Sequence, residues 1–199
     1  MIFNAEMVRA LLDGRKTQTR RPIKWKQTRF TEIGEREDGS KWPWSEDAEH
    51  ACDFWHPCPF GAVGDRIWVR EAFRVHSRAT DVATLVYKAS ERNSWTEQTR
   101  RVPVAVCNKP ATPEKWTPSL HMPRWASRIL LEITGVRVER LRSMSQDDAR
   151  AEGVIAASGP MEAGLAFREL WDSIYGEESW KANPWVWVIE FKRVEGGAA

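Results

Sequence analysis

GRKTQTRRP, at residues 14–22, is the stretch from which the fold of this chain can be predicted. It is dense in cationic and hydroxyl groups. A helix is predicted before it, over 4–14, because Asn4 suits the N-cap position and Gly14 suits the position after the last turn. Pro22 has no backbone N–H and cannot continue a helix. The stretch is therefore expected to be an extended segment that leaves the first helix.

Lys16 and Thr19 in this stretch are candidates for catalysis. A threonine hydroxyl is a poor nucleophile that needs a neighbouring base, and a lysine can be that base. In a fully extended segment, residues three apart point to opposite sides, so the pair requires a turn of the chain between them. A structural role is the alternative, since Arg15 and Lys16 follow a helix C-terminus, where the helix dipole favours cations.

The remaining elements, taken in order along the chain, predict an α+β fold. Strands are predicted over 66–71, 84–89, 128–141 (with Gly135 as a bulge) and 184–194, and helices over 146–152 and 160–175. Little of this order follows a strand–helix–strand pattern. It favours a small antiparallel or mixed β-barrel with helices outside it.

Two long insertions interrupt these elements, at about 24–60 and 91–125. The first is rich in tryptophan, charge and glycine, and it is predicted to be a long, partly ordered loop. The second is irregular and rich in proline. We expect one domain over 1–194 and a disordered tail at 195–199.

Four side chains of metal-ligand type lie close together in the first insertion: His50, Cys52, His56 and Cys58. A tetrahedral zinc site normally joins two ligand pairs from separate segments. The spacing here matches none of the usual patterns, so no metal is expected.

Composition excludes several classes of protein. The 199 residues carry a formal net charge of only +2, so the chain is not a generally basic nucleic-acid coat, and any nucleic-acid binding needs a local patch. No run of 18 apolar residues and no secretory signal is present, so no membrane partner is expected. With three cysteines and no even framework, a reducing cytoplasm is the simplest location, and we expect a monomer.

Glu152 is a second candidate for catalysis. It lies in the last turn of the helix predicted over 146–152, between the N-cap Ser145 and the terminating Gly153. The helix dipole disfavours a carboxylate at this end, and such local conflicts are more frequent at functional sites. An exposed glutamate paired with a nearby cation is the alternative.

Arginines interleaved with tryptophans form a third candidate, a groove that stacks bases and binds phosphates. Its members would be Arg20, Arg21, Arg70, Arg124 and Arg128, with Trp68, Trp116 and Trp125. The alternative is that these tryptophans fill the core and the arginines cover it.

Four pieces of the sequence together resemble the ASCH family of small PUA-like β-barrel domains. Gly14-x-Lys16-x4-Arg21 resembles its GxKxxxxR signature. The other pieces are the GD-plus-strand element at 64–69, the carboxylate-bearing helix at 145–154 and the closing strand at 187–192. The resemblance covers roughly 1–23, 61–90 and 126–194, and the longer layout is similar to ASCH-like proteins of phages and prophages.

This resemblance implies a PUA-like β-barrel with flanking helices and an amidohydrolase that removes the acyl group from N4-acetylcytidine without a cofactor. Carried over by position, the catalytic residues are Lys16, Thr19 and Glu152. Arg21 would stabilise the oxyanion, and Trp68 or Trp125 would stack on the pyrimidine. All three catalytic residues are predicted at the ends of elements, so substitutions there are expected to leave the melting temperature nearly unchanged.

Two questions stay open at this point. The hydroxyl that attacks the acyl carbonyl belongs either to Thr19 or to a water molecule activated by Glu152. The alternative function is a single-stranded RNA-binding module or a ribonuclease that uses the same basic cleft, because members of the family differ in this respect.

Overall fold

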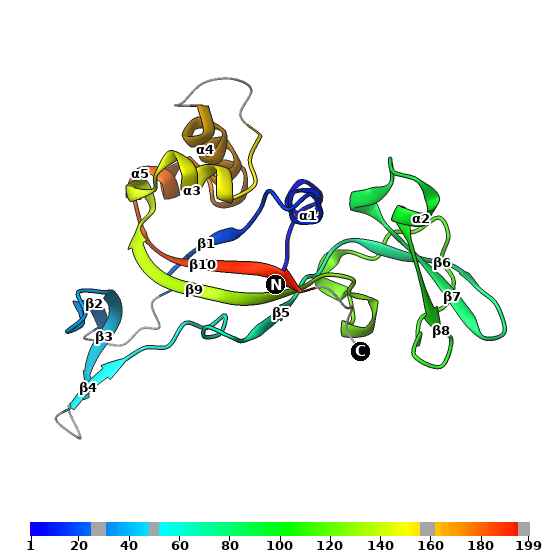
Figure 1. Ribbon diagram of the computed structural model, residues 1–199, viewed down its shortest axis with the longest axis horizontal. Coiled ribbons are helices and arrows are strands. Elements are labelled where there is room, and N and C mark those ends of the chain that lie inside the picture. The colour runs from blue at the N-terminus through cyan, green and yellow to red at the C-terminus, as the bar shows by residue number, and fades with distance from the viewer. Residues whose placement is uncertain (25–30, 48–51, 156–161, 195–199) are drawn as a thin grey trace. The chain divides into compact units, whose positions relative to one another are not determined.

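A computed structural model describes residues 1–24, 31–47, 52–155 and 162–194 of the chain. The fold is α+β, with many strands and few helices (Figure 1). The described residues form two compact units: the first contains residues 1–14, 66–131 and 193–194, and the second contains 15–24, 31–47, 52–65, 132–155 and 162–192. The expectation of a single domain over 1–194 stays a prediction.

The first unit begins with helix α1 (Ala5–Leu12), as the sequence predicts. The Asn4 side chain accepts a hydrogen bond from the Met7 amide at 2.8 Å, and Gly14 has a φ of +74° after the last turn. Only a residue that tolerates positive φ at low cost suits that position. The helix buries Val8 together with its apolar neighbours on one face.

The core of the first unit lies on an antiparallel sheet of order β6-β7-β8, made of Phe73–Arg78, Val82–Tyr87 and Thr99–Pro103. Its other elements are β5 (Arg66–Trp68), η1 (Lys88–Ser90), α2 (Trp95–Gln98), η2 (Ser119–His121) and η3 (Arg124–Ala126). The expectation that 91–125 is irregular is therefore wrong for α2 and β8. Strand β8 pairs with β7, and this long-range pairing is not visible in the local sequence.

The second unit contains the strand order β1-β10-β9, from Gln18–Pro22, Trp185–Val194 and Leu130–Arg140; β9 and β10 each have one end in the first unit. Figure 1 shows these strands curled, with the helices of the unit over one face. Those helices are α3 (Gln146–Ala151), α4 (Glu162–Tyr175) and α5 (Glu177–Ala182), with η4 (Leu141–Ser143) leading into α3. Val186 and Val188 pack against Phe167 and Trp171 of α4 between the two layers.

The first insertion is more ordered than predicted, because it forms a second antiparallel sheet. Strands β2 (Thr31–Glu35), β3 (Lys41–Asp47) and β4 (Cys52–Trp55) follow one another in that order. The prediction of a long loop over 24–60 is therefore wrong for these strands. Gly39 has a φ of +78° in the turn between β2 and β3, where Asp-Gly is a typical hairpin signal.

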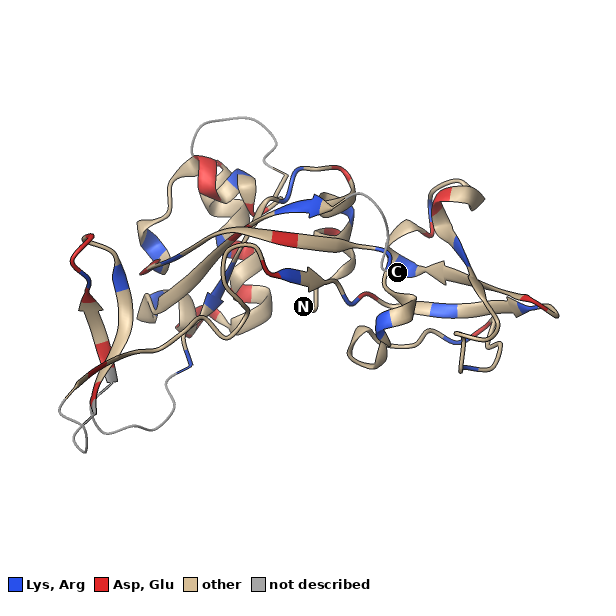
Figure 2. Cartoon of the chain, turned by 60° about the horizontal axis from the view of Figure 1, so that its bottom comes forward, with Lys and Arg blue, Asp and Glu red and all other residues tan. Residues whose placement is uncertain are grey.

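Two features of the described residues bear on possible partners. Basic and acidic positions are intermixed along the strands and helices, as expected for a net charge of +2 (Figure 2). None of the helices in the described ranges is both long and apolar enough to cross a membrane.

Candidate active site

The backbone brings Lys16 and Glu152 together, although they are 136 residues apart in the sequence. The two residues form an isolated antiparallel bridge. Next to it, the Thr17 amide donates to the Ala151 carbonyl, and the Phe191 amide donates to the Thr17 carbonyl, each at 2.8 Å. Strand β10 and the end of α3 therefore hold the segment before β1 from both sides.

Helix α3 places Glu152 at this position through strong signals at both of its ends. Ser145 and Asp148 form a capping box, which satisfies the first amides of the helix. Glu152 is the C-cap residue, and Gly153 follows it with a φ of +87°. The helix and its bounds agree with the sequence prediction to within one residue.

The Lys16 ammonium is buried and fully engaged with oxygen acceptors. Its Nζ donates to Oε2 of Glu152, to the Glu152 carbonyl and to the Gln18 carbonyl, each at 2.9 Å. The exposed fractions of the two side chains are 0% for Lys16 and 2% for Glu152. This is a solvent-excluded ion pair.

Burial lowers the pKa of Lys16 below its ordinary value, because the ammonium loses its hydration. The Glu152 carboxylate opposes this shift, and the charges of Arg21 and Arg20 add to it. Overall the pKa is lowered, so Lys16 loses its proton more readily than a solvated lysine does. A lysine whose pKa is lowered in this way can act as a base more readily than an ordinary lysine.

Arg20 completes the site, and sequence reasoning gave it no catalytic role. Its Nη1 lies 3.2 Å from Oε1 of Glu152, and its Nη2 lies 2.6 Å from Oε1 of Glu139. Glu152 thus holds a lysine on one carboxylate oxygen and an arginine on the other. Arg21, the predicted oxyanion ligand, is half-buried, with its Nη1 3.4 Å from the hydroxyl of Tyr175.

Asp148 links this centre to a hollow beside it. The Gln18 side chain donates to the Asp148 carbonyl at 2.8 Å, and Nη2 of Arg137 donates to Oδ1 of Asp148 at 2.8 Å. Partial burial favours the neutral acid, but hydrogen bonds from Ser145 and Gln18 and the charge of Arg20 hold the pKa of Asp148 below its ordinary value. Asp148 is therefore a fixed negative charge at neutral pH.

The hollow is a cavity of about 350 Å³ lined by Gln18, Asp148, Ala151, Glu190 and their neighbours. Its volume is at the lower end of the range of about 300–1,000 Å³ that is usual for small-molecule sites. Gln18 lines it, and the carbonyl of the same residue accepts from Lys16. Thr17 and Ala151, the chain neighbours of Lys16 and Glu152, also line the cavity, whereas Lys16 and Glu152 themselves do not.

Thr19 lies in β1, opposite Ile189 of β10, with an exposed fraction of 1%. Successive side chains of a strand point to opposite faces. Because Gln18 and Arg20 reach α3 and its C-cap, Thr19 belongs to the other face of the strand. The structure joins Lys16 and Glu152 directly, and the role of Thr19 as nucleophile stays a prediction.

No protein-family model, curated protein or solved structure matches the chain. The chemistry of the Lys16–Glu152 centre therefore rests on its own residues.

The two tryptophans expected to stack on the substrate both lie in the first unit. Trp68 is half-buried, with the guanidinium carbons of Arg70 and Arg124 at 4.5 and 5.8 Å from its ring. Trp125 packs against the core and meets Phe73 edge-to-face at 6.2 Å. Trp125 is therefore a core residue, as the alternative interpretation predicts. Trp68 has arginines beside its ring, as the predicted groove requires.

Two further members of the predicted groove, Arg128 and Trp116, have partners within the first unit. Arg128 donates to Oε1 of the buried Glu71 at 2.8 Å and lies 4.1 Å above the ring of Tyr87. Arg74 lies 4.5 Å above the ring of Trp116. Arg20 belongs to the second unit, in the centre described above.

The histidines and cysteines of the first insertion are dispersed where they are described. Cys52 is exposed, Cys58 is half-buried, and Nε2 of His56 lies 2.9 Å from the Ser45 hydroxyl. His50 lies outside the described residues. Among those that are described, no group of three or more His, Cys, Asp or Glu side chains could hold a metal ion.

Proposed function

We propose that this protein is an amidohydrolase that removes the acyl group from N4-acylated cytosine nucleosides. The observation that carries the proposal is the buried Lys16–Glu152 ion pair, in which the pKa of the lysine is lowered. The sequence GRKTQTRR and its resemblance to the ASCH family supply the substrate class. On this proposal the curled sheet with its covering helices is a PUA-like barrel.

The reaction needs a base, a nucleophile and an acid, and one lysine can supply both proton transfers. Neutral Lys16 takes the proton of the attacking hydroxyl as the new C–O bond forms at the acyl carbon. The Lys16 ammonium then gives that proton to the exocyclic nitrogen as the C–N bond breaks. The products are a carboxylic acid and the free cytosine nucleoside.

The neighbours of Lys16 have supporting roles in this scheme. Glu152 holds the lysine in position through the 2.9 Å contact and stabilises the ammonium formed midway. Arg20 is the guanidinium best placed to offset negative charge at this centre, because it binds the same carboxylate. Substrate would enter the cavity of about 350 Å³ lined by Gln18 and Asp148.

Direct attack by water is favoured over attack by Thr19. The strand alternation puts Thr19 on the face opposite Gln18 and Arg20, whereas Lys16 contacts Glu152 itself. In the Thr19 route, an ester forms first and a water molecule then hydrolyses it.

The second candidate function is a single-stranded RNA-binding module or ribonuclease. The specific observation for it is Trp68 with Arg70 and Arg124 beside its ring, which combines a stacking surface with positive charge. Such a module has no use for a buried lysine–carboxylate pair.

Incubation of the purified chain with N4-acetylcytidine tests the proposal, with cytidine measured by chromatography. We expect repeated turnover, with acetyl and bulkier acyl groups compared in parallel. An absence of product from every acyl substrate, together with tight binding of a single-stranded oligoribonucleotide, would favour the second function.

The pH dependence of turnover should report the lowered pKa of Lys16. The base form acts, so kcat/KM should rise with pH and reach half of its plateau below the value of 10.5 for an ordinary lysine. The folded state binds fewer protons at Lys16 than the unfolded state does, so stability should rise with pH over the same window. An ascending limb centred at or above 10.5 would contradict the assignment.

A further inference from the structure

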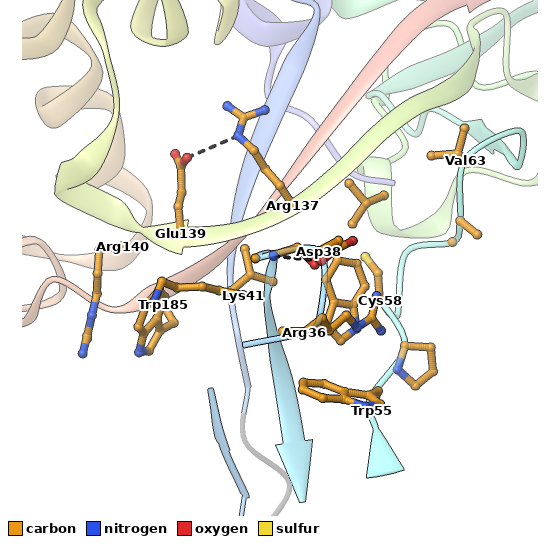
Figure 3. Close-up of a pocket in the computed structure, with 18 of the residues that line it drawn as sticks. Arg36, Asp38, Lys41, Trp55, Cys58, Val63, Arg137, Glu139, Arg140 and Trp185 are labelled. Carbon is orange, nitrogen blue, oxygen red and sulfur yellow. Dashed lines mark hydrogen bonds and ion pairs between the residues drawn. The ribbon is translucent and has the colours of Figure 1, made fainter. Parts of the chain in front are cut away.

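The second unit holds a larger cavity, formed by the sheet of the first insertion together with strands β9 and β10. Its volume is about 1090 Å³. Figure 3 shows Arg36 and Trp55 on one side of it and Arg140 and Trp185 on another. We call this the Arg–Trp cavity, defined by Arg36, Lys41, Trp42, Trp55, Arg140 and Trp185.

The cavity and the proposed catalytic centre have different lining residues apart from those of β9. Figure 3 shows the side chains of Arg137 and Glu139 on the opposite side of β9 from Arg140 and Trp185. Arg137 contacts Asp148, and Glu139 contacts Arg20, and both residues also line the Arg–Trp cavity. Lys16 and Glu152 do not line it.

Guanidinium groups stacked on indole rings are the distinctive feature of the cavity. The guanidinium carbon of Arg36 lies 4.3 Å from the ring of Trp42 and 5.2 Å from that of Trp55. Arg140 lies 4.4 Å above the ring of Trp185. Arginine N–H donors suit phosphate, and an arginine over a ring can offer those that are not already bonded. In Arg140, Nη1 donates to the Asn183 carbonyl at 3.1 Å.

The rings themselves are held in place by their surroundings. The Trp42 indole N–H donates to the His56 carbonyl at 2.7 Å, and its ring meets Trp187 edge-to-face at 5.0 Å. The Trp55 ring lies on Gly34, where an added Cβ would come within 2.9 Å of it. This preorganisation lowers the entropy cost of binding a flat ligand.

Charge at the cavity favours an anion. Four cations line it, Arg36, Lys41, Arg137 and Arg140, together with three carboxylates, Asp38, Asp65 and Glu139. Asp65 accepts a hydrogen bond from the Ala62 amide, and Asp38 accepts one from the Ser40 amide at 2.9 Å, each within its own turn. Glu139 pairs with Arg137 at 3.2 Å. All three carboxylates are therefore engaged.

We propose that the Arg–Trp cavity binds a nucleotide, with the base against an indole ring and the phosphate on one of the two arginines, Arg36 or Arg140. The aromatic rings supply stacking, which tolerates any base, and the arginines supply the anion site. The same chemistry is offered by a free nucleoside monophosphate and by one nucleotide of a single strand. This inference does not depend on the proposed hydrolase activity.

Calorimetric titration of the full chain tests this proposal with adenosine 5′-monophosphate, adenosine, inorganic phosphate and a single-stranded pentanucleotide. We expect the monophosphate to bind more tightly than adenosine or phosphate, and its binding to weaken with added salt. An affinity for the pentanucleotide well above that for the monophosphate identifies a strand as the source, and equal affinities identify the free nucleotide. Equal binding of phosphate and monophosphate, or no binding of either nucleotide ligand, would overturn the proposal.

Variants connect the binding to the cavity. Trp55→Leu should weaken monophosphate binding by about 5- to 150-fold, which is the usual effect of removing one stacking ring. Arg140→Met, at an exposed position, should weaken binding without disturbing the insertion, and it serves if Trp55→Leu fails to fold. Trp95→Leu removes an exposed ring in the first unit and is the matched control. Unchanged affinity in both Trp55→Leu and Arg140→Met would overturn the assignment.

Discussion

Glu152→Gln should reduce kcat/KM for N4-acetylcytidine by about 10²- to 10⁴-fold, the usual contribution of a positioned proton-transfer system. The amide keeps the shape of the side chain but removes the charge that holds the Lys16 ammonium at 2.9 Å. Lys16→Arg should be at least as damaging, because a guanidinium stays protonated and cannot act as a base. Turnover is measured by chromatography of cytidine.

The control for these variants is Glu178→Gln in α5. The Glu178 side chain is 87% exposed, so its charge is solvated and its loss should leave kcat/KM nearly unchanged. Equal turnover in Glu152→Gln and Glu178→Gln would assign Glu152 to architecture alone.

Thr19 variants separate the two routes of attack. If a water molecule attacks, Thr19→Ala should keep most of the activity. If the Thr19 hydroxyl attacks, Thr19→Ala should lose nearly all of it and Thr19→Ser should keep some. The position of Thr19 on the opposite face of β1 from Arg20 favours the first result.

The second large effect is on stability. Lys16→Met or Glu152→Leu alone should lower the free energy of unfolding by about 3–5 kcal/mol, because each leaves a buried charge without its partner. This corrects the sequence-based expectation that the melting temperature would hardly change: the side chains of Lys16 and Glu152 are 0% and 2% exposed. They lie at the ends of elements but inside the protein.

A double-mutant cycle tests the coupling. In the double variant Lys16→Met/Glu152→Leu, the free energy of unfolding should fall by much less than the sum of the losses in the two single variants. The reason is that both charges are removed together. Lys181→Met, which breaks the exposed pair with Glu178 at 3.0 Å, should change stability little and is the matched control. Additive losses in denaturant unfolding would show that the two charges are not coupled.

Helix ends were the most predictable parts of the fold. Asn4 and Ser145 are caps, and Gly14 and Gly153 have positive φ after the helices, as their residue types predict. These signals are local, because a cap bonds amides only a few residues away. The same local signals predict the position of Glu152 at the end of α3 without any knowledge of its partner.

Long-range pairing was the part that could not be predicted. Strands β2, β3 and β4 are short and rich in charge and tryptophan, so their alternation is weak, although Asp38-Gly39 marks one hairpin. Arg20 was not singled out as a catalytic-site residue, because its carboxylate partners lie 119 and 132 residues away. Arg20 contacts Glu152 and Arg21 contacts Tyr175 of α4, so both arginines reach the helical part of the unit. The local sequence does not show which of the two meets the carboxylate.

The most direct measurement is the time course of cytidine and acetate released from N4-acetylcytidine by the wild-type chain and by Lys16→Arg. The predicted result is many turnovers with equal amounts of the two products for the wild type, and at least a 100-fold slower release for a folded Lys16→Arg. Release by wild type no faster than in buffer, or equal release by both proteins, would contradict the assignment of Lys16 as the catalytic base.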